Sequence, residues 1–201
     1  MLFTRYLFPL ALLAGTSLSL SAAPTAAAPK PLCEGAPFSS TTKPRTTEVN
    51  VELMGAKELY LAVSDEGDKS CDWAAWIAPT LVMKDGKTLP LTDLKWNSAA
   101  QGSGKSNVNK NPMGGPISVE GKVVAQGIGT HAPSIIGYTL PEGAVRFTAQ
   151  TAIDDGGMMR GGQASSAKIR FFVYGEKPAD LPAFKAQPIY DPNAPKQVPD
   201  T

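Results

Sequence analysis

The stretch Val145-Arg-Phe-Thr-Ala-Gln-Thr-Ala-Ile153 decides the fold class of this 201-residue chain, because its alternation of core-type and polar residues is the cleanest in the sequence. Successive side chains of a β-strand point to opposite faces of a sheet, so a period of two predicts a strand with one buried face. We expect Val145, Phe147, Ala149, Thr151 and Ile153 to face a core, and the residues between them to face solvent.

Shorter segments of strand character lie on both sides of this stretch, at residues 49–53, 59–63, 76–83, 94–96, 117–119, 123–125 and 169–173. Turn signals such as Asp85-Gly86 separate them, and no convincing helical periodicity occurs between residues 47 and 175. Pro79 fits a strand only at an edge or a bulge. About eight to ten short strands with turns between them predict an all-β fold, an antiparallel β-sandwich.

The two ends of the chain differ in composition from this central region. Residues 1–28 carry one charge, Arg5, followed by an apolar run too short to span a bilayer comfortably, which predicts a secretory signal peptide. Residues 29–46 then form a Pro- and Thr-rich leader, residues 47–175 the β-sandwich, and residues 176–201 a Pro-rich tail that is a tether or simply loose. We therefore expect one domain in a secreted or periplasmic monomer without a transmembrane segment.

Charge and cysteine content narrow the possible partners. Without the signal peptide, 18 basic residues balance 18 acidic residues. This neutrality argues against a nucleic-acid partner or an anionic membrane surface. Cys33 and Cys71 are the two cysteines, and an exported compartment favours a disulfide between them, which would tie the leader to the domain.

An acidic turn precedes the first two tryptophans. Its side chains Asp65, Glu66, Asp68 and Asp72 could gather oxygen atoms around a calcium ion. A solvated hairpin loop has the same composition, so we expect no cofactor and assign no metal ligand.

The segment Gly127-Ile-Gly-Thr-His-Ala-Pro-Ser-Ile-Ile-Gly-Tyr138 contains the only histidine of the chain. Its glycines followed by β-branched residues predict a turn that feeds a buried strand. His131 then lies where a loop meets a rigid strand, a place suited to a ligand-contacting group. The alternative is a hydrogen-bonded structural histidine.

A shallow sugar site needs polar groups that make paired hydrogen bonds and a flat ring for the apolar face of the sugar. The glycine-rich second half supplies such polar groups in or beside its loops, and Trp73, Trp76 and Trp96 supply rings, of which we expect at least two to be mostly buried. The candidate ligand-binding residues are Asn107, Asn109, His131, Asp154, Asp155, Arg160 and Trp96.

Catalysis lacks support in the sequence. A Ser-His-Asp arrangement would have to use His131, with Ser134 near it and Asp154 able to approach, but no nucleophile elbow surrounds a serine. Asp154 and Asp155 are adjacent on one strand end and would point in different directions. We therefore predict that the protein is not an enzyme.

Several segments and single residues form a recognisable set: Leu91-Thr-Asp-Leu-Lys-Trp96, Gly114-Gly-Pro-Ile-Ser-Val119, Gly127-Ile-Gly-Thr-His-Ala-Pro-Ser134, Tyr138, Arg146-Phe147, Asp154 and Phe171-Phe-Val173. Together they resemble the NPCBM domain, a carbohydrate-binding module found beside family 98 glycoside hydrolases. The resemblance implies a galactose-binding-like jelly roll, a glycan partner of galactose type and no catalysis. It also implies that His131 and Asp154 match the family's histidine and acid. A structural or protein-interaction sandwich of the cell envelope, without sugar binding, is the alternative.

Overall fold

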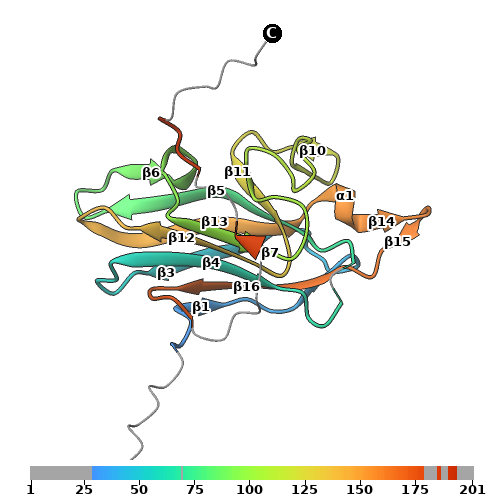
Figure 1. Cartoon of the computed structure of the whole chain (residues 1–201), viewed down its shortest axis with the longest axis horizontal. Coiled ribbons are helices and arrows are strands. Elements are labelled where there is room, and N and C mark those ends of the chain that lie inside the picture. Colours follow the sequence, from blue (N-terminus) through green and yellow to red (C-terminus); the bar gives the residue numbers. More distant parts are fainter. Residues whose placement is uncertain (1–28, 69, 179–184, 187–189, 194–201) are drawn as a thin grey trace, which may run out of the picture.

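A computed structural model describes residues 29–68, 70–178, 185–186 and 190–193; the predicted signal peptide lies outside this part of the chain. All strand pairs in it are antiparallel, and two sheets pack face to face (Figure 1). The predicted antiparallel β-sandwich is therefore confirmed.

The first sheet has the strand order β1 (Cys33–Glu34), β16 (Lys168–Tyr174), β4 (Glu58–Ser64), β12 (Ser134–Thr139), β7 (Ser98–Gln101) and β17 (Lys185–Ala186), with β2 (Phe38–Ser39) also on β16. The second sheet has the order β3 (Thr47–Glu52), β13 (Ala144–Ile153), β5 (Trp73–Met83), β11 (Gly127–His131) and β8 (Asn107–Val108), with β6 (Thr88–Pro90) also on β5.

Two small hairpins, β9 (Ser118–Val119) with β10 (Lys122–Val123) and β14 (Met159–Arg160) with β15 (Gln163–Ala164), lie at one end of the sandwich beside the one-turn helix α1 (Asp155–Met158) (Figure 1). A 3-10 turn, η1 (Leu91–Asp93), follows β6. Both helical elements are single turns, too short to produce a periodic pattern in the sequence.

The core between the sheets is built on Trp76, which is fully buried. Its ring meets Phe147 of the same sheet at a centroid distance of 6.1 Å and Phe171 of the first sheet at 5.0 Å, both edge to face. Such contacts add to the burial of large rings. Trp76 therefore joins the two layers at their centre.

Strand β13 follows the predicted alternation, with Phe147, Ala149 and Ile153 buried and Gln150 exposed. Two residues depart from it. Val145 is 38% exposed near the start of the strand, and Ala152 is buried on the outer face. Ala152 belongs to a row of small residues with Ala75 and Gly129, and Ala152 and Ala75 are fully buried.

Strand β5 contains a bulge at Pro79, one of the two placements expected for this proline. Gln150 pairs with Ile77 and Thr148 with Thr80, so two residues of β5, Ala78 and Pro79, lie opposite one residue of β13. A proline lacks the N–H of a regular ladder and is tolerated at such a site.

The glycine-rich segment around His131 differs from its prediction. It forms two strands rather than a turn and one strand: β11 belongs to the second sheet and β12 to the first. The chain therefore crosses between the layers at residues 132–133, and His131 is the last residue before the crossing.

The segment at residues 97–115, rich in Gly, Ser and Asn, contains strands β7 and β8. A buried polar network joins its two sides: Ser106 Oγ donates to Gln101 Oε1 at 2.6 Å, and Thr130 Oγ1 donates to the same oxygen at 3.1 Å. Residues 94–96, predicted as a strand, follow η1 as irregular chain.

The predicted leader and tail each contribute to the first sheet, through β1 and β2 and through β17. Strands of two residues depend on the edge they join, so their own sequence carries no alternating pattern. Among the described residues, no helix is both long and apolar enough to cross a membrane.

Candidate functional site

Strands β13 and β11 of the second sheet end where the strand between them, β5, begins, and this brings two predicted site residues together. Asp154 follows β13, and its backbone N–H donates to Trp73 O on β5 at 2.8 Å. His131, on β11, is the register partner of Trp73. His131 and Asp154 thus lie on either side of Trp73.

His131 is 6% exposed, and its Nδ1 lies 2.7 Å from Ala132 O. A carbonyl oxygen only accepts, so Nδ1 carries a proton, and in the neutral imidazole Nε2 is then an acceptor. Among the described residues, the hydrogen bond of Nδ1 is the one that the His131 ring makes with the protein, and Nε2 makes none. One acceptor of the ring is thus left for a ligand at the edge of the sheet.

Asp154 is 1% exposed and holds two backbone donors. Its Oδ1 accepts from Gly156 N and its Oδ2 from Ser118 N, both at 2.8 Å. Burial raises the pKa of this carboxyl group, and the two hydrogen bonds oppose the rise. Asp154 therefore caps α1 and anchors β9 to it.

Asp155 continues this anchoring on the neighbouring hairpin. Its carboxylate accepts from Glu120 N at 3.0 Å and from Gly121 N at 2.8 Å. Each acid thus bonds to backbone N–H groups of the β9–β10 hairpin, which explains why two adjacent aspartates follow β13.

The two predicted asparagines fix the loop around β8. Asn107 Nδ2 donates to Asn111 O at 2.8 Å, and Asn109 Oδ1 accepts from Gly127 N at 3.0 Å. Arg160 is exposed on β14, in the hairpin next to α1.

Trp96 is placed differently from its prediction. It is 3% exposed, and its ring lies 5.0 Å from the ring of Tyr190, which belongs to the tail. Its burial under the tail argues against the predicted ligand contact. The half-buried ring at the His131 end is Trp73, and the burial of Trp76 and Trp96 confirms the prediction for two of the three tryptophans.

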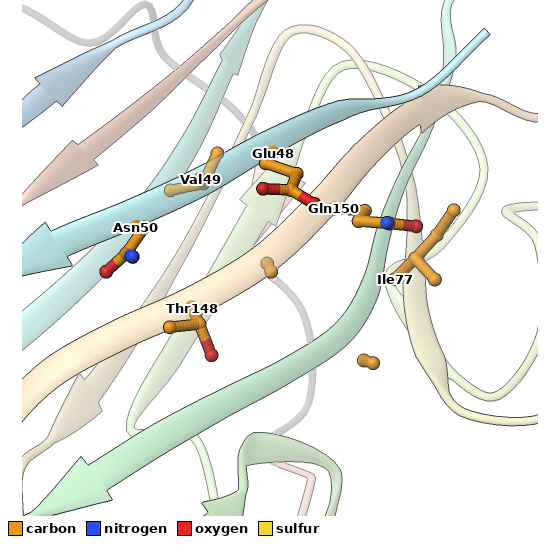
Figure 2. Close-up of a pocket in the computed structure, with 8 residues that line it drawn as sticks. Glu48, Val49, Asn50, Ile77, Thr148 and Gln150 are labelled. Carbon is orange, nitrogen blue, oxygen red and sulfur yellow. The ribbon is translucent and has the colours of Figure 1, made fainter.

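A second feature of this sheet was not predicted from the sequence. The outer face of β3, β13 and β5 carries a shallow hollow of about 420 Å³ (Figure 2). It is lined by Glu48, Val49, Asn50, Ile77, Ala78, Thr148, Ala149 and Gln150. The alternation in β13 predicted that Thr148 and Gln150 face solvent, but the hollow also depends on which strands become neighbours.

The family model described as the NPCBM/NEW2 domain matches residues 87–197, which are more than half of the chain. The chain belongs to this family. The NPCBM match begins in the turn between β5 and β6 and includes both His131 and Asp154. Searches of curated proteins and of solved structures found no match.

NPCBM membership makes the chain a relative of carbohydrate-binding modules rather than of catalytic domains. The geometry around the histidine agrees with this. His131 Nδ1 bonds to a backbone carbonyl rather than to an acid, and both oxygens of Asp154 hold backbone N–H groups. Ser134 Oγ is buried without a hydrogen-bond partner in the described part of the chain. These three residues form no catalytic triad.

The acidic turn of this NPCBM chain is occupied by protein contacts. Glu66 bonds to Arg170, Asp68 accepts from Ser70 N at 3.0 Å, and Asp72 Oδ1 accepts from Lys168 N at 2.9 Å. In the part of the chain that the structure describes, no three His, Cys, Asp or Glu side chains are grouped to hold a metal ion.

The predicted disulfide is absent, because both thiols are free. Cys33 pairs with Val173 near the end of β16, whereas Cys71 precedes Asp72, which bonds to Lys168 at the start of that strand. Five residues of strand span ~17 Å. A disulfide needs Cα atoms within about 7 Å, so this prediction was wrong.

Proposed function

We propose that this protein is an exported, non-catalytic carbohydrate-binding module that recognises a glycan at the end of the second sheet around His131 and Asp154. The observation that carries the proposal is the NPCBM family match, which includes both residues. Export is supported by the composition of residues 1–28.

The chemistry of this edge suits a sugar. Trp73 offers a half-buried indole ring, and rings of this kind bind the C–H face of a pyranose. Beside it, His131 Nε2 can accept a hydrogen bond from a sugar hydroxyl. In this proposal Asp154 is a positioning residue, because its oxygens hold Gly156 and Ser118.

A glycan array with the mature protein tests the function, with circular dichroism to confirm a folded sample. We expect retention of neutral glycans, with galactose-terminated structures among the probes. If a folded sample retains no glycan at millimolar concentration, the carbohydrate proposal fails and a structural or protein-interaction role in the envelope replaces it.

Two substitutions at His131 test the site itself. His131→Ala should weaken glycan affinity about tenfold, equivalent to roughly 1 to 2 kcal/mol for one lost hydrogen bond. His131→Asn is the matched variant, because its amide can still donate to Ala132 O but places no acceptor where Nε2 lies. It should lose affinity and keep the melting temperature. Variants that lose stability but keep full affinity would contradict the ligand role of His131.

A further inference from the structure

We propose that the hollow on the outer face of β3, β13 and β5 is a second glycan-binding surface, selective for neutral sugars. This inference rests on the proposed carbohydrate-binding function. It assigns a ligand to a site formed by Glu48, Asn50, Thr148 and Gln150, separate from the His131 edge.

The four side chains form a regular array on two paired strands. Glu48 is the register partner of Gln150, and Asn50 is the partner of Thr148. Cross-strand partners are about 5 Å apart and alternate residues of a strand about 7 Å apart, so the array measures about 5 by 7 Å. A pyranose ring with its hydroxyl groups has similar dimensions. Figure 2 shows the four side chains on adjacent strands, with Ile77 beyond Gln150.

These groups have unused hydrogen-bonding capacity. Within the described residues, none of the four side chains makes a hydrogen bond or ion pair with the protein, and three of them are exposed. A carboxylate only accepts, whereas the two amides and the hydroxyl both donate and accept. Sugar hydroxyls also donate and accept, so this set can bind a ring through several hydroxyls at once.

The bulge of β5 supplies the apolar part of the hollow. Ala78, with a φ of 45°, is exposed there, and Ile77 is half-buried next to it. Their carbon atoms can contact the C–H groups of a sugar, while the polar array binds its hydroxyls.

Charge selects the class of glycan. Among the eight lining residues Glu48 alone is ionisable. In the next row, Arg146 already forms an ion pair with Glu52. An anionic sugar would therefore meet a carboxylate without a free cation from the lining to offset it, so sialylated or uronic sugars should bind less well.

A row of small, buried residues separates the hollow from the His131 edge. Between them lies the row Ala152, Ala75 and Gly129. A Cβ on Gly129 would lie 2.3 Å from Lys110 O, so the loop after β8 rests directly on Gly129, and Ala75 and Ala152 are fully buried. Substitutions in the hollow can therefore be made without touching Trp73 or His131.

The experiment compares the wild type with Gln150→Ala, Glu48→Gln and the double variant Asn50→Ala/Gln150→Ala. Glu142→Gln is the control, because Glu142 is an exposed glutamate in the turn before β13. Titration calorimetry with lactose, sialyllactose and any further glycan retained on the array measures affinity, and melting temperature measures folding. All these side chains are on the surface, so we expect melting temperatures close to that of the wild type.

We expect Gln150→Ala to weaken binding of the neutral glycan at least fivefold. The double variant should abolish binding of the neutral glycan to the hollow. Glu48→Gln should reduce the difference in affinity between neutral and sialylated probes. Glu142→Gln should leave both affinities unchanged. If the wild type binds glycan but the hollow variants bind it equally well, this inference is overturned while the proposed function stands. If the folded wild type binds no glycan, both fail.

Discussion

Asp72 is fully buried immediately before β5, next to an acidic turn. Burial raises the pKa of its carboxyl group to about 7, the charges of Asp65 and Asp68 add to the rise, and the hydrogen bond from Lys168 N opposes it. The unfolded chain should release this proton near pH 4. Between about pH 4 and pH 7 the folded state therefore holds the proton that the unfolded state has lost.

From this difference we predict that Asp72 makes the protein less stable as pH rises from about 4 to about 7, by at most about 1.4 kcal/mol per pH unit. The side chain in Asp72→Asn cannot titrate. The free energy of unfolding of this variant, relative to that of the wild type, should therefore increase as pH rises from about 4 to about 7. Urea unfolding at several pH values measures both. Asp85→Asn, on an exposed turn, is the control, and parallel pH profiles for Asp72→Asn and wild type would refute the prediction.

Asp154 and Asp155 differ in burial although both accept two backbone hydrogen bonds. Asp154→Ala leaves Ser118 N and Gly156 N without their acceptor and should cost about 1 to 3 kcal/mol of stability. Asp155→Ala should cost less, because water can replace its more exposed carboxylate. Chemical denaturation compares the two, and faster amide exchange at Ser118 in Asp154→Ala would locate the damage. Equal costs for both variants would contradict this account.

At the scale of elements, the tail covers an aromatic side chain of the sandwich. Tyr190 lies on Trp96, its hydroxyl is 3.4 Å from Thr92 O, and Asp191 lies 3.6 Å from Lys95. We predict that Tyr190→Ala shifts tryptophan fluorescence to longer wavelength and lowers the melting temperature. Tyr190→Phe keeps the ring and loses only a long hydrogen bond, so it should behave like the wild type. An unchanged spectrum in Tyr190→Ala would show that the tail does not shield Trp96.

The elements that could be predicted are those whose own residues carry the pattern. The alternation of residues predicted strand β13, and Asp85-Gly86 predicted the turn after β5. Pro79 indicated an irregular position in β5, which is the bulge. β1, β2 and β17 could not be found, because two-residue strands are defined by the edge that they join.

The proximity of His131 and Asp154 comes from the pairing of strands. His131 and Asp154 were singled out from the sequence, and the register of β11, β5 and β13 brings them together. The burial of Asp154 was not visible in the sequence, since the β9–β10 hairpin that bonds to it comes from another part of the chain. The hollow of Glu48 and Gln150 requires a pairing across about 100 residues, which no local pattern encodes.

For the whole molecule, the free cysteines predict insensitivity to reductant. Cys33 and Cys71 are far apart, so adding dithiothreitol should leave the melting temperature unchanged. Thiol titration of the denatured, unreduced protein should find two thiols per chain. A mass spectrum with Cys33 and Cys71 peptides linked, in protein recovered from its native compartment, would contradict the structure.

The placement of β1 and β17 has a mechanical consequence. They form opposite edges of one sheet, and each is held by a register of two residue pairs, whereas β12 and β4 at the centre share six. Among the strands, tension on either end of the chain therefore reaches a short outer strand first, and at the C-terminal end it loads the contact of Tyr190 with Trp96 before β17. These strands should peel away at low force and lengthen the connection to whatever pulls on the protein. The second sheet, with its hollow and the His131 edge, would meanwhile stay folded and able to hold a ligand under load.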